Sequence, residues 1–250
     1  MKYKLVAFWL VVFGALFAFL QTRFEYHFYY IEQSQLFLFT EAYIRNKLLL
    51  PGGFSMLVAE FLVQFFIRPY VGALVTAALL TGVGVCTAGI VKRIAPVSGL
   101  FILYVLPMLA LLFMHFDFNY RVQGTVCYLM MMALLCGYMR IRNDLFRLVA
   151  GCVLVTVLFW LAGSIAVLFA GMVCLFEGLR KTPKWYISLI GVAEVLLLGV
   201  GTVYFSLMGE YRWVFGPDLY YHNTDPSKRN HLLFLDLPAS GLSCRFLYPE

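Results

Sequence analysis

The sequence contains few charged residues. Only 13% of its 250 residues are Asp, Glu, Lys or Arg, while 62% are hydrophobic, whereas soluble domains have about 25% charged and about 45–50% apolar residues. A chain with so little polar surface is not expected to fold as a soluble domain. The composition therefore predicts an integral membrane protein of the all-α, polytopic helical class.

Enzyme motifs and metal-ligand clusters are also missing. The sequence has no GxSxG, no HExxH, no Walker loop and no GxGxxG that opens a helix after a strand. Its six cysteines form no CxxC pair and have no metal-type spacing, so we interpret them as small core residues. The four histidines are scattered along the chain. We therefore expect no bound metal and no cofactor.

Positive charge is in excess, but its placement argues against a nucleic-acid partner. The formal net charge is +6, and the basic residues stand at the ends of apolar runs. In that position they set membrane topology and meet anionic lipid headgroups. Membrane lipids are therefore the expected partners, and nucleic acid is not.

Seven apolar runs follow one another, most of them close to the about 20 residues that cross a hydrocarbon core as a helix. They cover residues 5–21, 70–91, 97–116, 122–139, 148–162, 164–178 and 185–208. The first run resembles a signal peptide, but bulky residues replace the small ones of a cleavage site, so we expect a retained span. The prediction is one helical transmembrane domain over residues 1–210. Residues 211–250 are a short extracytoplasmic tail that packs on the outer face or continues into a longer chain.

The basic residues orient the predicted spans. If the spans alternate, one side receives Lys2, Lys4, Lys92, Arg93, Arg140, Arg142, Arg147, Arg180, Lys181 and Lys184. Such clustering is typical of cytoplasmic loops. On the other side, arginines and lysines are offset by acidic residues. We therefore expect a multi-pass protein of the inner membrane, with a cytoplasmic amino terminus and an extracytoplasmic tail.

The segment between Arg147 and Arg180 does not fit a single span. As one helix it would be roughly 48 Å long, too long for one crossing and short for two. The sequence WLAGSIAV places Gly163 and Ser164 in its middle. A hairpin that turns there keeps Arg180 on the basic side, whereas one tilted helix would move the tail inside.

Residues 28–68 form a long external connection, which is more typical of a functional or interfacial segment than of a simple link. Residues 30–47 are compatible with a helix, with Glu41 and Arg45 at i, i+4 on one face. Such a helix would lie in the headgroup plane. Pro51-Gly52-Gly53 is expected to end it, because Pro cannot continue a helix and glycines permit a sharp reversal.

A second helix, residues 54–69, is predicted to follow this turn. It places Glu60, Gln64 and Arg68 four residues apart, as one polar stripe on an apolar cylinder. One interpretation is an internal pair between Glu60 and Arg68, or a hydrogen bond between Glu60 and Gln64, that orients the helix. The other is contact with a substrate or an ion.

Glu194 stands inside the apolar run LIGVAEVLLLGVG. A carboxylate near the middle of a span costs several kcal/mol unless it is paired, protonated or in contact with water. Glu194 is therefore either a neutral, hydrogen-bonded structural residue or a functional group on a path through the membrane.

Several stretches together resemble one uncharacterised family. EQSQLFLFT with PGGF, EFLVQFFIRPYVGAL and FWLAGSIAVLFAGMVCLFEGLR resemble multi-pass inner-membrane proteins of Gram-negative gut bacteria, known only as a domain of unknown function. The resemblance covers residues 1 to about 225. It implies longer members with further spans and a soluble carboxy-terminal part, of which this chain is an amino-terminal portion.

The order of elements is also similar to membrane glycosyltransferases that use polyprenyl-phosphate sugars. In those enzymes, a carboxylate of the first external loop acts as general base and arginines neutralise the lipid phosphate. The resemblance implies Glu32 or Glu41 as the base, with Arg45, Arg68 or Arg121 at the phosphate. The competing interpretation of both carboxylates is solvated interfacial charge.

Three classes of function therefore compete. The first is an inner-membrane protein of unknown function with an outward-facing site for a lipid phosphate or a lipid-linked sugar. A transporter would instead line a path through the membrane with Glu60 and Glu194, and a structural or assembly protein would use the aromatic loop as a flat contact surface. The sequence alone does not decide whether the chain is an enzyme.

Overall fold

The computed structural model describes residues 2–35, 37–94, 101–117, 119–180 and 193–194. Within these ranges it consists of helices without strands, so the predicted all-α class is confirmed there. The helices are α1 (Lys2–Arg23), α2 (Glu25–Ser34), α3 (Glu41–Leu48), α4 (Gly53–Val63), the 3-10 helix η1 (Gln64–Ile67), α5 (Val71–Ile94), α6 (Phe101–Met114), α7 (Val122–Tyr138), α8 (Asp144–Ala162) and α9 (Ile165–Leu179). Apart from residues 193–194, the predicted run at 185–208 and the tail at 211–250 lie outside the described residues.

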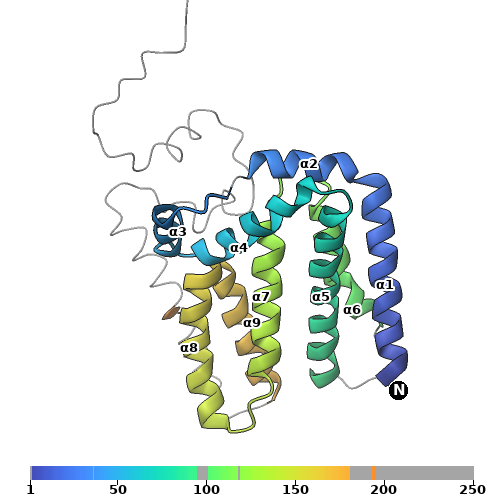
Figure 1. Ribbon diagram of the computed structural model, residues 1–250. Helices are drawn as coiled ribbons and strands as arrows, with labels where there is room; N and C mark the ends of the chain where they lie inside the picture. The colour runs from blue at the N-terminus through green and yellow to red at the C-terminus, as the bar shows by residue number, and fades with distance from the viewer. Residues whose placement is uncertain (1, 36, 95–100, 118, 181–192, 195–250) are drawn as a thin grey trace, which may run out of the picture.

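The longer helices form a bundle, and three helices lie across one of its ends. In Figure 1, α1 and α5 to α9 run roughly along one direction, while α2, α3 and α4 lie across the end opposite the amino terminus. Helix α5 packs against α1, α6 and α7, and α7 packs against α4, α5, α8 and α9. The α5–α7 contact is therefore the seam between the two halves of the bundle.

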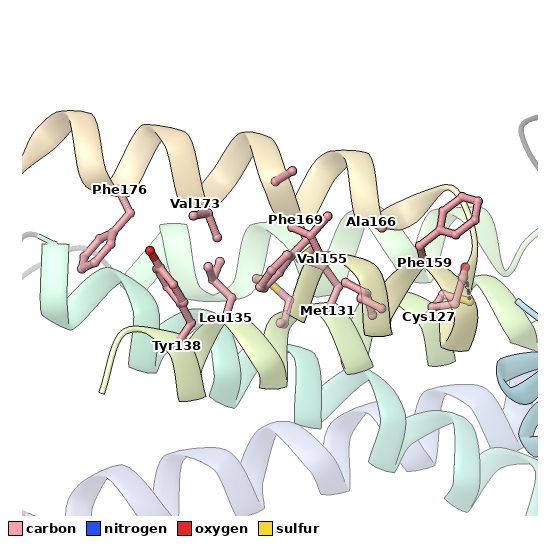
Figure 2. Close-up of a cluster of buried hydrophobic side chains, with 14 of the residues drawn as sticks. Cys127, Met131, Leu135, Tyr138, Val155, Phe159, Ala166, Phe169, Val173 and Phe176 are labelled. Carbon is pink, nitrogen blue, oxygen red and sulfur yellow. Dashed lines mark hydrogen bonds between the residues drawn. The ribbon is translucent and has the colours of Figure 1, made fainter. Parts of the chain in front are cut away.

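Each half of the bundle has its own apolar core. One cluster joins α7, α8 and α9 through large side chains such as Leu135, Phe159 and Phe169, and Figure 2 shows these side chains converging between the helices. A second cluster joins α1, α2, α4, η1, α5, α6 and α7 and includes the buried side chains of Leu20, Phe66 and Leu80. Burial of such side chains contributes about 1.5–3 kcal/mol each, so most of the packing free energy comes from these two cores.

Seven membrane spans were expected, and among the described residues two helices are long and apolar enough to cross a membrane. They are the helix segments Leu5–Arg23 and Val71–Ile94. Five further apolar helices are shorter, at 10–17 residues in their apolar part. Buried helices of soluble proteins and signal sequences meet the same length and composition criterion, so this evidence for a membrane protein is weak.

The predicted hairpin is confirmed. Helix α8 ends at Ala162 and α9 begins at Ile165, and the two helices pack side by side. Gly163 has a φ of +73°, a left-handed conformation that glycine adopts without the steric cost of a Cβ atom. Gly163 therefore makes the reversal, as the sequence indicated.

The predicted helix over residues 30–47 is wrong, because the chain forms two helices there. Helix α2 ends at Ser34, α3 begins at Glu41, and both Gln35 and Thr40 have extended backbone angles. The stretch between them contains Phe37, Phe39 and Thr40, and aromatic and β-branched residues have lower helix propensity than the flanking sequence. The segment predicted to be external thus contains three helices, α2, α3 and α4, in place of two. After that prediction, these three are called the external helices.

The PGG turn joins α3 to α4 and places α4 against the hairpin. Gly52 has a φ of +80° and its N–H donates a hydrogen bond to the Trp160 carbonyl at 2.9 Å. At Gly53, a Cβ atom would stand 1.7 Å from the Lys47 carbonyl oxygen. Both glycines are therefore required, Gly52 for its backbone angle and Gly53 for the close approach of α3.

We predict that Gly53→Ala destabilises the protein, since the new methyl group must push α3 away from α4. Overpacking of this kind costs about 1–3 kcal/mol, so the thermal unfolding midpoint of the purified protein in detergent should fall. Gly171→Ala is the matched control, because nothing lies within 4 Å of the Cβ position at Gly171. Equal midpoints for the two variants would contradict the prediction.

Candidate functional site

Three side chains of the external helices form one polar cluster around Glu60. The Tyr43 hydroxyl donates to Glu60 Oε2 at 2.5 Å, and Lys47 Nζ lies 3.2 Å from Glu60 Oε1. Tyr43 and Lys47 are four residues apart on α3 and so share a face. Burial, the hydrogen bond and the negative charge of Glu60 together raise the pKa of Tyr43. The cluster attaches α3 to α4 and keeps the phenol protonated.

The expected polar stripe of Glu60, Gln64 and Arg68 does not form. Helix α4 ends at Val63 and the chain continues as the 3-10 helix η1, which changes the direction of the following side chains. Gln64 Nε2 donates to the Phe37 carbonyl at 2.8 Å, and Arg68 is exposed at the end of η1. The internal partners of Glu60 are therefore Tyr43 and Lys47, and not Arg68 or Gln64.

The proposed bases lie on two different helices. Glu32 is partly exposed on α2, while Glu41 and Arg45 are exposed on α3. In the part of the chain that the structure describes, no hydrogen bond or ion pair joins the side chains of Glu32, Glu41, Arg45 and Arg68 to one another. The structure thus puts these groups on the external helices without gathering them into an ion-paired cluster.

Arg121 and Glu194 lie apart from this cluster. Arg121 is partly buried directly before α7, and its carbonyl accepts a hydrogen bond from the Gly124 N–H at 3.0 Å. Glu194 accepts a hydrogen bond from the Thr156 hydroxyl of α8 through Oε1, and Thr156 also reaches the Cys152 carbonyl at 3.2 Å. This contact agrees with the interpretation of Glu194 as a hydrogen-bonded structural residue.

Two buried histidines were not recognised from the sequence. His115 Nε2 lies 2.8 Å from the Thr125 hydroxyl, which is also 3.3 Å from the Tyr120 hydroxyl. His27 is 5% exposed, and its burial lowers its pKa, an effect that Asp117 partly offsets. Burial therefore favours the neutral form of His27. The spacing of the histidines in the sequence does not predict that His27 and His115 lie close together, because α2 and the α6–α7 connection meet only in the tertiary structure.

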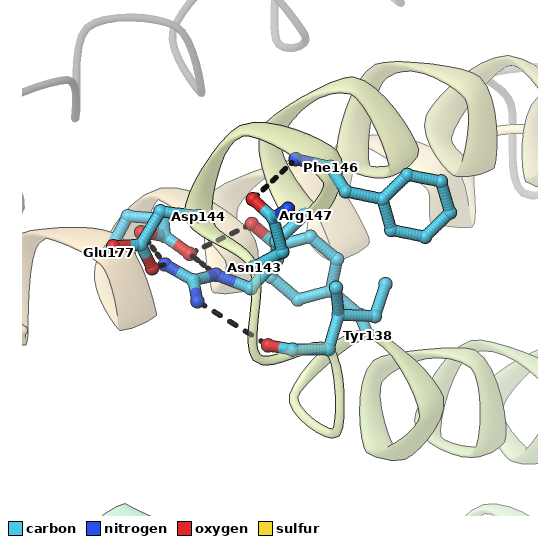
Figure 3. Close-up of polar contacts among 7 residues, drawn as sticks. Tyr138, Asn143, Asp144, Phe146, Arg147 and Glu177 are labelled. Atoms are coloured by element: carbon cyan, nitrogen blue, oxygen red, sulfur yellow. Dashed lines mark hydrogen bonds and ion pairs between the residues drawn. The ribbon is translucent and has the colours of Figure 1, made fainter.

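A fully buried ion pair at the opposite end of the bundle was also missed. Arg147 Nε donates to Glu177 Oε1 at 2.6 Å and Arg147 Nη2 donates to Oε2 at 3.0 Å, with both side chains 0% exposed. Figure 3 shows Tyr138 and Asp144 beside the pair. The Tyr138 hydroxyl donates to Glu177 at 2.9 Å, and Arg147 Nη2 is 2.8 Å from Asp144 Oδ1. The network connects α7, α8 and α9.

The environment of Arg147 differs from the sequence interpretation. Arg147 was assigned to the basic loops and is instead enclosed by the network, whereas Arg140 and Arg142 are exposed. The available signal was Glu177, a carboxylate inside the apolar stretch VCLFEGLR, which needs a partner at that depth.

The described residues offer no metal site made of three or more His, Cys, Asp or Glu side chains. Chemically, the external helices present exposed carboxylates and guanidinium groups, while the other end has a neutralised internal pair. The buried pair is therefore suited to a structural role, whereas the exposed groups of the external helices are accessible to solvent.

We predict that Glu177→Ala strongly destabilises the protein, because it leaves the Arg147 guanidinium buried without its bidentate partner. Breaking a buried pair costs about 3–5 kcal/mol, measured as a lower midpoint of thermal or denaturant unfolding in detergent. Arg142→Ala removes an exposed arginine from the same connection and should change the midpoint little.

The double variant Arg147→Met/Glu177→Leu tests the cause. Removing both charges leaves no uncompensated ion. The double variant should therefore lose less stability than the sum of the losses in the single variants Arg147→Met and Glu177→Leu. Additive losses, or a Glu177→Ala variant as stable as Arg142→Ala, would show that the pair contributes only packing.

Comparison with known proteins adds a family assignment. No curated protein and no solved structure matches the chain. One family model matches residues 1–246, nearly the whole sequence, and it describes a family of unknown function. The chain belongs to this family of unknown function, DUF6057.

Proposed function

We propose that the chain is an integral membrane protein of the inner membrane, with α1 and α5 to α9 as spans and the amino terminus in the cytoplasm. The support is the exposed apolar surface of these helices. Monomeric soluble proteins seldom expose such extended apolar patches, whereas lipid solvates them. The exposed side chains include Leu10, Val11, Ile102, Leu106, Phe113, Phe146, Val149, Val153, Leu168 and Leu175.

The distribution of charge supports the same orientation. The end of the bundle at the amino terminus has exposed Lys92, Arg93, Arg140, Arg142 and Arg180, as cytoplasmic loops do. The end covered by α2, α3 and α4 has both acidic and basic residues. In this orientation the external helices lie at the outer headgroup level.

Reporter fusions test this topology. Fusions after Arg93, Arg142 and Lys184 should give a cytoplasmic signal, because each follows an even number of proposed spans. A fusion after Arg229 should give an extracytoplasmic signal, because the apolar run at residues 185–208 is proposed as a seventh span. A cytoplasmic signal at Arg229, or an extracytoplasmic signal at Arg142, would refute the orientation.

We further propose that the outer end binds the phosphate of a lipid or of a lipid-linked sugar. The single observation behind this proposal is that exposed arginines stand among exposed aromatic side chains on the helices across that end. Arg45 follows Phe39, and Arg68 lies between Phe65 and Tyr70, all of them exposed. Aromatic rings favour the headgroup level, and guanidinium groups form bidentate hydrogen bonds with phosphate.

In this proposal, Arg45, Arg68 and Arg121 neutralise the phosphate while Glu32 or Glu41 accepts a proton from an acceptor hydroxyl. Neither carboxylate is fully buried, so an acceptor hydroxyl can come within hydrogen-bond distance of it, as a general base requires. Glu60 and Gln64 support the site by attaching α4 to α3 and to the Phe37 carbonyl. Glu194, which accepts a hydrogen bond from Thr156 of α8, has no part in this proposed site.

A structural or assembly role is the second candidate. The internal pairing of Glu60 with Tyr43 and Lys47 favours it, because this charge already serves helix packing. In that case the exposed aromatic residues of α3, α4 and η1 form a contact surface for another membrane protein.

Native mass spectrometry of the purified protein tests lipid binding. Arg45→Gln/Arg68→Gln should retain about ten-fold less anionic phospholipid than the wild type, since a hydrogen bond to a charged group is worth about 1.5–3 kcal/mol. Arg140→Gln/Arg142→Gln is the control, because it removes the same charge from exposed arginines at the other end. Competition with inorganic phosphate separates a bare phosphate site from one that also needs the lipid.

Two further variants test the proposed role of Glu32 or Glu41 as a general base. Glu32→Gln or Glu41→Gln keeps shape and hydrogen bonding but removes the base, so lipid binding should persist while release of sugar from a polyprenyl-phosphate donor is lost. Equal lipid retention in both double arginine variants would overturn the phosphate site. Full activity of both glutamine variants would show that neither Glu32 nor Glu41 acts as the base.

A further inference from the structure

The seam between α5 and α7 is built from small residues that let the helices approach closely. A Cβ atom added at Gly82 would stand 3.2 Å from Leu129 Cδ1, and one added at Gly89 would stand 3.4 Å from Cys136 Sγ. Gly82, Cys86, Gly89 and Arg93 follow one another at helical spacing, so one face of α5 meets α7. Two cysteines thus face each other across the seam.

The thiols of Cys86 and Cys136 lie in direct contact range. Cys136 Sγ is 3.3 Å from the Cys86 carbonyl oxygen, and the two thiol groups also interact with each other. Both residues are partly exposed and reduced. A disulfide needs Cα atoms usually 4.4–6.8 Å apart, and the contact of the Cys136 thiol with the Cys86 backbone makes the two cysteines direct neighbours across the seam.

Positive charge surrounds this pair. Arg93 Nη1 donates to the Cys136 carbonyl at 3.1 Å, and the guanidinium groups of Arg93 and Arg140 both act electrostatically on the Cys136 thiol. Reactive cysteines are found in partly exposed, electropositive surroundings of this kind, whereas structural cysteines are buried and inert.

The other described cysteines have no such arrangement. Cys127 is fully buried and donates to the Ala162 carbonyl at 3.6 Å, while Cys152 lies on α8 and Cys174 on α9. Electrostatic or hydrogen-bond coupling between two thiols is present only for Cys86 and Cys136 in the part of the chain that the structure describes.

We propose that Cys86 and Cys136 form a reversible dithiol–disulfide site that responds to peroxides. The thiolate of one cysteine attacks an oxygen of hydrogen peroxide and breaks the O–O bond, which gives a sulfenic acid and hydroxide. The hydroxide takes up the proton that the thiol had lost and becomes one water. The second thiol displaces the hydroxyl of the sulfenic acid, which forms the S–S bond and releases a second water. The two sulfurs lose two electrons to the peroxide, and an added thiol reductant reverses the step.

The proposed bond would join the two halves of the bundle. Cys86 is on the helix that packs against α1 and α6, while Cys136 is on the helix that packs against α8 and α9. Oxidation would fix the seam covalently and close a long loop, and such cross-links stabilise the folded state by restricting the unfolded chain. The inference does not depend on lipid or phosphate binding at the outer end.

Peroxide treatment of the full chain in detergent tests the proposal. The wild type should lose two of its six alkylatable thiols, and peptide mass spectrometry should find Cys86 linked to Cys136, with both thiols restored by dithiothreitol. Oxidation should also raise the thermal unfolding midpoint. In Cys86→Ser and in Cys136→Ser, peroxide should neither remove two alkylatable thiols nor raise the unfolding midpoint. Cys152→Ser should respond to peroxide as the wild type does.

The peptide map of the wild type decides the outcome even if one variant folds poorly. Retention of all six thiols at peroxide levels that oxidise an exposed control thiol would overturn the proposal. So would a disulfide between other cysteines, or sulfinic acid at Cys86 or Cys136 without the linked peptide.

Discussion

The contact between the start of α4 and the α8–α9 turn governs the shape of the covered end. Gly52 has a positive φ and donates to the Trp160 carbonyl at 2.9 Å, and Gly163, also with a positive φ, makes the turn that it meets. A Cβ at Gly52 would stand 3.4 Å from the Gly163 nitrogen. Because residues with a Cβ atom are strained at this positive φ, Gly52 is suited to the turn that places α4 across the bundle end with α3 beside it. Gln123 of α7 reaches Ser55 at 3.3 Å and adds a second attachment.

The ion pairs at the two ends of the bundle differ in how deeply they are buried. On the external helices, the Lys47–Glu60 pair remains 24% and 13% exposed, so water shares in its solvation and the pair contributes little net free energy. At the other end, Arg147 and Glu177 are both fully buried. There the pair is needed mainly because either charge alone would be costly, and its bidentate geometry with Tyr138 and Asp144 fixes the arrangement of α7, α8 and α9.

The two halves of the bundle meet at a seam that is narrow and rich in small residues. Close backbone approach is a common means of association between helices in membranes, where lipid and side chains are equally apolar. The seam also brings together cysteines that are 50 positions apart, at residues 86 and 136. Its chemistry is therefore separate from that of the external helices, where the proposed phosphate site lies.

The sequence by itself determined the helical class, the position of most apolar helices, the PGG turn and the hairpin at Gly163, because apolar periodicity, Gly and Pro act locally. For Glu60 it left two interpretations open, an internal partner on its own helix or contact with a substrate or an ion. Only the tertiary structure decided which partner, since Tyr43 and Lys47 reach Glu60 through the angle at which α3 returns over α4. The pairing of Arg147 with Glu177, the contact of Cys86 with Cys136 and the burial of His27 were likewise decided by helix packing. These contacts join residues that are far apart in the chain. The distances between such residues depend on how the helices pack, which local sequence patterns do not specify.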